Sequence, residues 1–273
     1  MMILSLGVKA HYTDVDRALA LSKSIEFHED FNSVTGDGLM RQIAALGILA
    51  DHTIDSLSVH APIYKPVGDF DLNEKEDDDI LRRTLAVGEN MLQYVPRVLY
   101  VLHAEGRRLR LNGPRARRDA VERLANKANS FADGGSQVTI ENTGHWNGAQ
   151  MFAGLRDFPA LFEYTEKDTG MTLDICHLFM EYKENGYKEL DDFVRSYGDK
   201  VFNLHVADVR FSDPIKTEGT QIGEGSIDFD RVFDSLSRIT SGRRAMLIPE
   251  IRDGYIDDYA GFKLAFKRLK PRI

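Results

Sequence analysis

The sequence predicts an α/β protein of the (β/α)₈ class, a TIM barrel that forms a single domain over residues 1–273. Three observations favour this fold. Eight short runs rich in Val, Ile, Leu and Phe recur along the chain. Most of them are followed by a longer segment whose apolar residues have helical spacing. The length of 273 residues also suits one such barrel, which typically has ~250 residues.

The expected strands are short, and several are continuously apolar, as strands covered on both faces are. They span Ile3–Val8, Ser24–Phe27, Ser56–His60, Val98–His103, Val138–Glu141, Thr172–Ile175, Val201–Val206 and Ala245–Glu250. The expected helices span Gly36–Ala50, Asp77–Tyr94, Arg115–Ala132, Phe158–Lys167, Tyr187–Tyr197, Phe229–Thr240 and Asp257–Leu269. A doubly wound open sheet is the alternative, but the segment GVKAHYTD after the first strand is not the glycine-rich phosphate turn of that fold.

The composition argues against several classes of partner. The formal net charge is −8 and the pI is about 5.5, which disfavours nucleic acids and anionic membranes. Cys176 is the only cysteine, so no intrachain disulfide can form. No run reaches the ~18 apolar residues of a membrane-spanning helix. The apolar start of the chain is too short for a signal peptide and lacks a basic leader. We therefore expect a cytoplasmic protein with no membrane partner.

Ionisable residues stand at the ends of six expected strands. Their carboxyl ends carry His60, His103, Glu141, Asp174 with His177, His205 and Glu250. Such residues are rarely buried unless they are paired or bind a metal. The carboxyl ends of all strands of a barrel face one mouth, so we expect these side chains to meet there although they are far apart in the sequence.

Four of these residues predict a divalent-metal site, namely Glu141, Asp174, His205 and Glu250. Three carboxylates and one imidazole suit Mn²⁺, Mg²⁺ or Co²⁺ and also tolerate Zn²⁺. Other residues are expected around this site with lesser roles: His60, His103 and His177 as neighbours, Glu26 as an outer contact, and Cys176 as a core residue. No role in the site is expected for His11, His28, His52 and His145.

The same residues resemble the xylose isomerase-like barrel superfamily, which contains sugar isomerases and epimerases alongside the endonuclease IV class of DNA-repair enzymes. The resemblance covers roughly residues 24–251 and rests on the order and spacing of short motifs. These are VHAP at 59–62, IEN at 140–142, LDICH at 173–177, LHVAD at 204–208, IGEGSIDF at 222–229 and PE at 249–250.

Likeness to the isomerase and epimerase branch implies a metal held by Glu141, Asp174, His205 and Glu250. It also implies that Glu141 and Glu250 act as an acid–base pair on opposite faces of the substrate carbon, and that His177 and Arg210 contact substrate oxygens. The protein would then be a divalent-metal-dependent isomerase or epimerase of a sugar or sugar derivative. Proton transfer would pass through an enediolate, although a hydride shift is also compatible with these residues.

Likeness to the endonuclease IV branch implies zinc-dependent phosphodiesterase or abasic-site endonuclease activity, with His60 and His103 as ligands of a second metal. That branch has an Asp-x-His pair just before the IGEG stretch, where this chain has Thr217-Glu218-Gly219, so a reduced metal set is implied. A phosphate-bearing partner could dock on the basic cluster formed by Arg107, Arg108, Arg110, Arg115, Arg117 and Arg118, which is otherwise a solvated loop and helix start.

The sequence leaves three further points open. The glycine-rich stretch Ile222–Gly225 (IGEG) is either an anion-binding turn or a tight turn before the next helix. A barrel that binds a small ligand without catalysis is a third functional class. Exposed outer helices are also compatible with a homo-oligomer.

Overall fold

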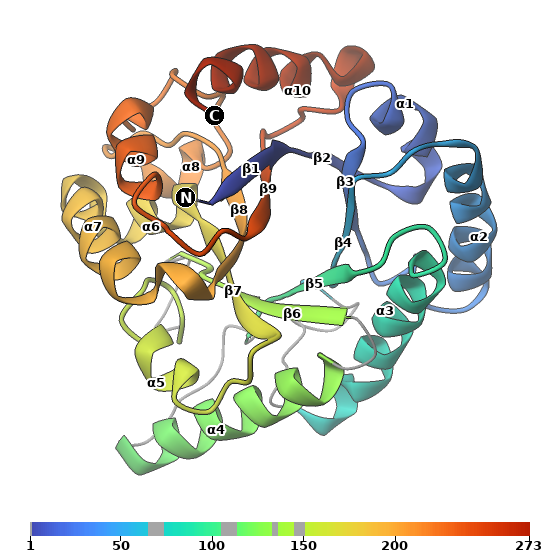
Figure 1. The fold of residues 1–273 in the computed structure, drawn as a ribbon, viewed down its shortest axis with the longest axis horizontal. Coiled ribbons are helices and arrows are strands. Elements are labelled where there is room, and N and C mark those ends of the chain that lie inside the picture. The colour runs from blue at the N-terminus through green and yellow to red at the C-terminus, as the bar shows by residue number, and fades with distance from the viewer. Residues whose placement is uncertain (1, 65–73, 105–113, 133–135, 145–150) are drawn as a thin grey trace.

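The computed structural model describes residues 2–64, 74–104, 114–132, 136–144 and 151–273, and it forms a ring of parallel strands surrounded by helices (Figure 1). The strands are β1 (Ile3–Leu6), β2 (Val8–Ala10), β3 (Ser24–His28), β4 (Ser56–His60), β5 (Val98–Leu102), β6 (Ser136–Glu141), β7 (Thr169–Asp174), β8 (Val201–Val206) and β9 (Arg244–Pro249). They pair in the order β1-β9-β8-β7-β6-β5-β4-β3-β2, and every pair is parallel. The predicted TIM barrel is confirmed.

The first barrel strand is divided at Gly7, which the sequence did not predict. β1 pairs with β9 and β2 pairs with β3, so the two halves together close the ring. The Gly7 N–H donates to the Leu247 carbonyl at 3.0 Å, and a Cβ at position 7 would overlap the Ile248 side chain. A glycine therefore lets the chain pass against β9 while it changes partner.

The helices lie outside the ring, and each expected helix has a counterpart. They are α1 (Val15–Leu19), α2 (Asp37–Ala45), α3 (Asp78–Met91), α4 (Pro114–Phe131), α5 (Phe158–Phe162), α6 (Ile175–Tyr182), α7 (Gly186–Tyr197), α8 (Pro214–Thr217), α9 (Phe229–Leu236) and α10 (Ile256–Leu269). α1, α6 and α8 were not expected. None of the helices in the described ranges is long and apolar enough to cross a membrane.

The amphipathic pattern explains how these helices pack. In α3 the buried apolar residues include Ile80, Leu81, Val87 and Met91, which recur at helical spacing and cover the barrel. In α9 the Asp228 side chain accepts hydrogen bonds from the Asp230 and Arg231 N–H groups at 3.1 and 3.2 Å. This N-cap satisfies amides that have no partner inside the helix.

Strand alternation decides which side chains enter the barrel, because successive residues point to opposite faces. The interior of the barrel holds two kinds of buried residue. A separate apolar cluster consists of Leu99, Val101, Phe202, Met246 and Ile248. Buried polar residues include Glu26, Ser58, Thr139, Thr172 and Asn203. The ionisable residues gather at the carboxyl ends of the strands.

Candidate metal centre

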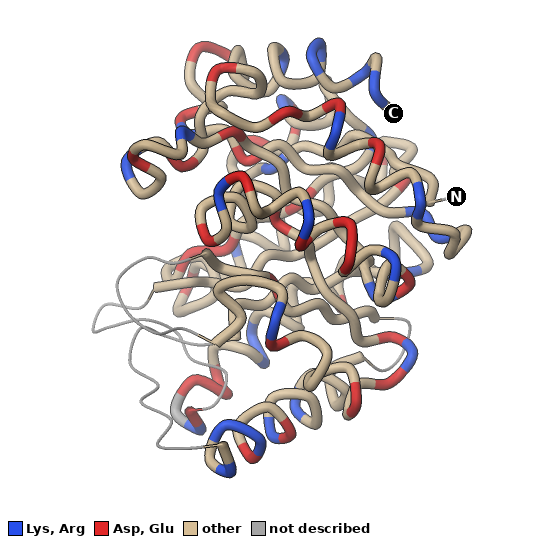
Figure 2. The backbone as a smooth tube through the Cα atoms, turned by 90° about the vertical axis from the view of Figure 1, so that its left-hand side faces the viewer, with Lys and Arg blue, Asp and Glu red and all other residues tan. Residues whose placement is uncertain are grey.

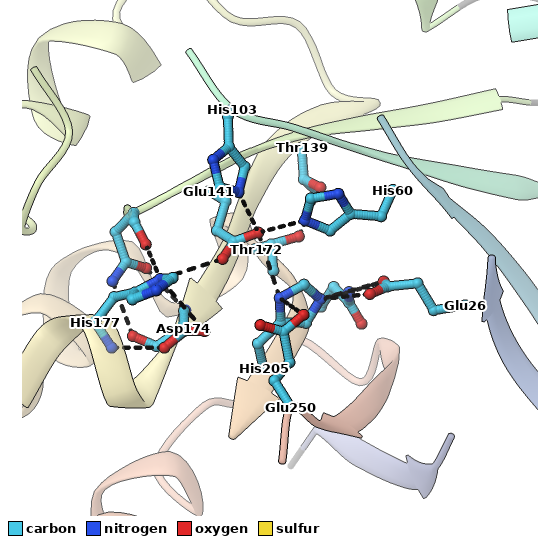
Figure 3. A network of polar contacts seen from close by, with 12 residues as sticks. Glu26, His60, His103, Thr139, Glu141, Thr172, Asp174, His177, His205 and Glu250 are labelled. Carbon is cyan, nitrogen blue, oxygen red and sulfur yellow. Dashed lines mark hydrogen bonds and ion pairs between the residues drawn. The ribbon is translucent and has the colours of Figure 1, made fainter. Parts of the chain in front are cut away.

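The carboxyl ends of the strands bring together all seven strand-end residues that the sequence singled out. Figure 3 shows Glu141 between the two histidines His60 and His103 on one side and His177 on the other, with His205 and Glu250 below it. They come from different strands and from the residues that follow them, so the ring closure, and not their place in the sequence, makes them neighbours.

Four of them form a cluster suited to a cation, which we call the tetrad: Glu141, Asp174, His205 and Glu250. One ligand atom from each lies within 4.8 Å of the others. His205 Nδ1 is 3.3 Å from Glu141 Oε2 and 3.3 Å from Glu250 Oε1. His205 Nδ1 and Glu141 Oε1 are buried without a hydrogen bond of good geometry. Buried polar atoms left in this way fit a divalent ion that would take them as ligands.

Glu141 also belongs to a second group, the triad of His60, His103 and Glu141. Its three ligand atoms again lie within 4.8 Å of one another. Glu141 Oε2 is 3.2 Å from His60 Nε2 and 3.4 Å from His103 Nε2. Glu141 thus belongs to both sets of candidate ligands, so the two sets together could hold two ions.

The charges of the tetrad act strongly on one another. Burial disfavours charged His205, but the carboxylates of Glu26 and Glu250 outweigh it and raise the His205 pKa well above its usual range. Burial would raise the pKa of Glu250, but the charges of Lys9 and His205 hold it well below its usual range. Burial raises the pKa of Asp174 to about 7, helped by the negative charges of Glu141 and Glu250. The site therefore holds both ionised carboxylates and one whose ionisation is suppressed.

A buried carboxylate behind His205 sets the orientation of its ring. Glu26 Oε1 is 3.0 Å from His205 Nε2, so Nδ1 is the nitrogen that faces the tetrad. Glu26 itself accepts hydrogen bonds from Ser58 Oγ at 2.9 Å and from Asn203 Nδ2 at 3.2 Å. A carboxylate that binds the far nitrogen of a ligating histidine is the usual outer support of a metal site.

The comparison with known protein families agrees with the fold. A model of the family described as xylose isomerase-like TIM barrel matches residues 23–269. The chain belongs to this family. No curated protein sequence matches the chain.

Solved structures of this barrel type are similar over nearly the whole length. One is L-ribulose 3-epimerase, with 18% identity, a TM-score of 0.65, and coverage of 98% of this chain and 94% of that chain. A second is 3-keto-D-glucoside 4-epimerase from E. coli, with 15% identity, a TM-score of 0.67 and coverage of 99% and 100%. A third is IolI protein with a bound zinc atom, with 17% identity, a TM-score of 0.66 and coverage of 98% and 98%. At these identities the likeness concerns the fold.

The segment LDICH of this family member differs from its predicted form. The strand ends at Asp174, and α6 begins at Ile175, so Cys176 and His177 belong to a helix and not to a strand. Asp174 caps this helix, because its Oδ1 accepts from the His177 N–H at 2.6 Å. The cap places the His177 ring 3.3 Å from Glu141 Oε1. Cys176 is buried, as expected.

Asn142 fixes the same helix start. Its side chain donates to the Asp174 carbonyl and accepts from the Asp174 N–H, both at 2.8 Å. Two hydrogen bonds from one amide hold β6 and β7 in register at the place where Glu141 and Asp174 leave the strands. The motif Ile140–Asn142 therefore supplies both a candidate ligand and its support.

Lys9 is a site residue that the sequence reasoning missed. Its Nζ contacts Glu250 Oε1, and both side chains are largely buried. Burial opposes the charged form of Lys9, but the carboxylates of Glu250 and Glu26 outweigh it and raise its pKa. The signal in the sequence was a lysine inside the apolar run LSLGVKA, which is unusual for a barrel strand without a buried partner.

Glu218 and His28 were also missed. Glu218 Oε1 is 3.8 Å from His177 Nε2, and its other oxygen is 3.3 Å from Arg252 NH2. Glu218 thus lies at the place where the endonuclease IV branch has its Asp-x-His pair, and its carboxylate faces His177. The His28 ring lies beside the His60 ring, with 5.3 Å between their centroids. Burial lowers the His28 pKa well below its usual range.

A cavity of about 570 Å³ opens beside the tetrad. Glu250 is the tetrad residue among its described lining, together with Lys9, and the segment after β9 contributes an aromatic wall of Tyr255, Tyr259 and Phe262. Arg210, which was expected to contact substrate, is exposed and does not line this cavity. Its N–H donates to Thr217 Oγ1 at 2.9 Å, and its role stays a prediction.

The structure describes only part of the predicted basic cluster. Arg107, Arg108 and Arg110 lie outside the described residues, and so does His145. Arg115 and Arg118 are exposed at the start of α4. Arg117 is committed to an ion pair with Asp157.

The IGEG stretch is a tight turn around a buried carboxylate. Asp208 Oδ2 accepts from the N–H groups of Gly223 at 3.0 Å and Gly225 at 2.8 Å. Asp208 Oδ1 accepts from Val209 at 2.8 Å and Ile227 at 3.1 Å. The chain therefore fills this nest of amides with its own anion, and the interpretation as a phosphate site is wrong.

Proposed function

We propose that this member of the family is a divalent-metal-dependent isomerase or epimerase that acts on an uncharged sugar or sugar derivative. One observation carries the proposal: Glu141, Asp174, His205 and Glu250 converge within 4.8 Å beside a cavity large enough for a small sugar. The epimerases among the similar structures support the same reaction class.

The two glutamates of the tetrad take the catalytic roles in this proposal. Glu141 ends β6 and Glu250 directly follows β9, so two carboxylates from different strands could take up and return a proton at the substrate carbon. A divalent cation held by the tetrad would polarise the substrate carbonyl and make the adjacent C–H more acidic. Return of the proton to the neighbouring carbon gives an isomerase, and return to the opposite face of the same carbon gives an epimerase.

The cavity lining favours a substrate without a phosphate or carboxylate group. The lining includes two basic residues of permanent charge, and each already has a carboxylate partner, Lys9 with Glu250 and Arg252 with Glu218. Among the described lining residues no further lysine or arginine remains to neutralise an anionic substrate. The aromatic wall can instead pack against the C–H face of an open-chain sugar.

The test is the metal content of the protein together with its activity on a panel of unphosphorylated ketoses. We expect chelation to abolish turnover and Glu141→Gln and Glu250→Gln each to lower kcat by ~10²–10⁴-fold. Glu122→Gln, an exposed carboxylate on α4, is the matched control. Exchange of the substrate C–H with solvent deuterium reports proton transfer directly. If the protein takes up no divalent metal and both variants keep full activity, the proposal is wrong.

The triad favours a second candidate, a phosphodiesterase of the endonuclease IV type with two metal ions. His60, His103 and Glu141 would hold a second ion, in addition to the one held by the tetrad. Such an enzyme needs a basic face for the nucleic-acid backbone. Figure 2 shows Lys and Arg interspersed with Asp and Glu along the described helices. A metal content of two ions per chain, together with nicking of an abasic duplex, would support this candidate. A metal content of one ion per chain that is unchanged in His103→Ala supports the isomerase.

A further inference from the structure

A second cavity lies at the opposite end of the barrel from the tetrad, among the amino ends of the strands. It has a volume of about 270 Å³. Three guanidinium groups line it: Arg97 directly precedes β5, Arg243 directly precedes β9, and Arg244 begins β9. The segment SGRRA and the segment VPRVL, which are remote in sequence, therefore supply one positively charged rim.

These guanidinium groups have no carboxylate partner in the part of the chain that the structure describes. None of the three takes part in an ion pair within 4.0 Å or in a side-chain hydrogen bond there. Other arginines of the chain are paired, as Arg238 is with Asp191 at 2.8 Å. Asp55 is the one acidic residue of the described lining, and it makes no ion pair with them.

Arg243 is the most constrained of the three. Its Cζ lies 3.8 Å from the centroid of the Phe202 ring, so the planar group stacks on an aromatic floor. Partial burial lowers the pKa of Arg243, and the charge of Arg97 adds to this effect, against the opposing influence of Asp168 and Asp199.

The floor of the cavity separates it from the metal centre. Leu99, Phe202 and Met246 line the cavity and also belong to the apolar cluster inside the barrel, which continues through Val101 and Ile248 toward the other end. A ligand in the cavity would therefore reach neither the tetrad nor the larger cavity above it. Its recognition would depend on the arginine rim and the apolar floor.

We propose that this cavity is a binding site for a small multivalent oxyanion that carries phosphate or carboxylate groups. Phosphate and carboxylate share the paired oxygens that the guanidinium fork binds in two parallel hydrogen bonds. A volume of about 270 Å³ admits an organic anion of a few carbon atoms as well as inorganic phosphate. No residue of the tetrad lines this cavity.

Calorimetric titration with inorganic phosphate and with citrate, at ionic strength held constant with chloride, tests the proposal. We expect saturable binding by the wild-type protein and an affinity about tenfold weaker or worse in the double variant Arg97→Gln, Arg243→Gln. Arg41→Gln, an exposed arginine on α2, removes the same charge elsewhere and should bind as the wild type does. The stronger of the two anions identifies the class.

Arg243 packs on Phe202, so the double variant could be destabilised. The single variant Arg244→Gln removes an exposed side chain from the same rim and should weaken binding without lowering the melting temperature in chloride. Wild-type protein that binds neither anion at millimolar concentration overturns the proposal, as does equal binding by the wild type and both rim variants. Neither readout involves metal or turnover, so the outcome is independent of the proposed function.

Discussion

Lys9 and Glu250 form an ion pair across the closure of the barrel, although 241 residues separate them. Lys9 lies on β2 and Glu250 directly follows β9, so the contact exists only when the first and last strands of the ring meet. The lysine holds one oxygen of a candidate ligand and places a positive charge beside the tetrad. It therefore orients Glu250 and at the same time competes with a cation for it.

Replacement of Lys9 by methionine should separate these two effects. We expect Lys9→Met to bind divalent metal about tenfold more tightly, because a like charge is removed from the ligand set. Turnover should fall, since Glu250 loses its orientation. Chelator competition measures the affinity, and Lys9→Arg, which keeps the charge, is the control. An affinity that is unchanged or weaker in Lys9→Met would contradict this account of Lys9.

Glu26 should control metal affinity although it is not in the tetrad. Glu26→Gln weakens the support of His205 Nε2, and we expect metal affinity to fall ~10–100-fold. Ser58→Ala removes only one hydrogen bond to Glu26 and should cause a smaller loss. Both affinities can be measured by competition with a chelating dye. Equal affinities in Glu26→Gln and wild type would mean that His205 is oriented by other contacts.

Glu29 should make the stability of the fold depend on pH. Burial raises the pKa of Glu29 to about 7, against the hydrogen bonds from Ser33 and Gln42. The folded state favours the protonated form of Glu29. The stabilisation that results is complete below the unfolded pKa of about 4.5 and is lost as pH rises through about 7. Its loss lowers the free energy of unfolding by ~3 kcal/mol.

Glu29→Gln should remove that dependence. We expect the fall in unfolding free energy between about pH 5 and about pH 8 to be smaller in the variant by up to ~3 kcal/mol. Urea titrations at both pH values measure it. Asp51→Asn changes an exposed carboxylate elsewhere on the surface and should leave the pH profile close to that of the wild type. Parallel profiles for Glu29→Gln and wild type would show that Glu29 ionises freely in the folded state.

Asp208 should be a large single contributor to the stability of the loop after β8. Its two oxygens accept four backbone hydrogen bonds inside the fold. Asp208→Asn turns an N–H₂ group toward amides that can only donate, so we expect a loss of ~3 kcal/mol. Urea unfolding measures the loss, with the exposed Asp213→Asn on the same loop as control. Similar midpoints for the two variants would refute the role of Asp208.

The strand ends could be predicted because their signal is local. Short apolar runs identify the strands, and an ionisable residue that ends such a run is conspicuous by itself, as with Glu141, His205 and Glu250. The helix start at Ile175 was missed because its signal is not an apolar run. The expected strand Thr172–Ile175 extends one residue beyond β7, and the Asp174 side chain that caps the helix makes a contact that apolar patterning does not record.

By itself, the sequence determined the number and order of the barrel strands and the chemistry at their carboxyl ends, because alternation and hydrophobic runs act between residues close in the chain. Only the tertiary structure decided which of these groups touch. The pairing of Lys9 with Glu250, the support of His205 by Glu26 and the gathering of three arginines under the barrel all depend on the register in which the ring closes. That register is set by the packing of the whole chain and leaves no mark at any single position.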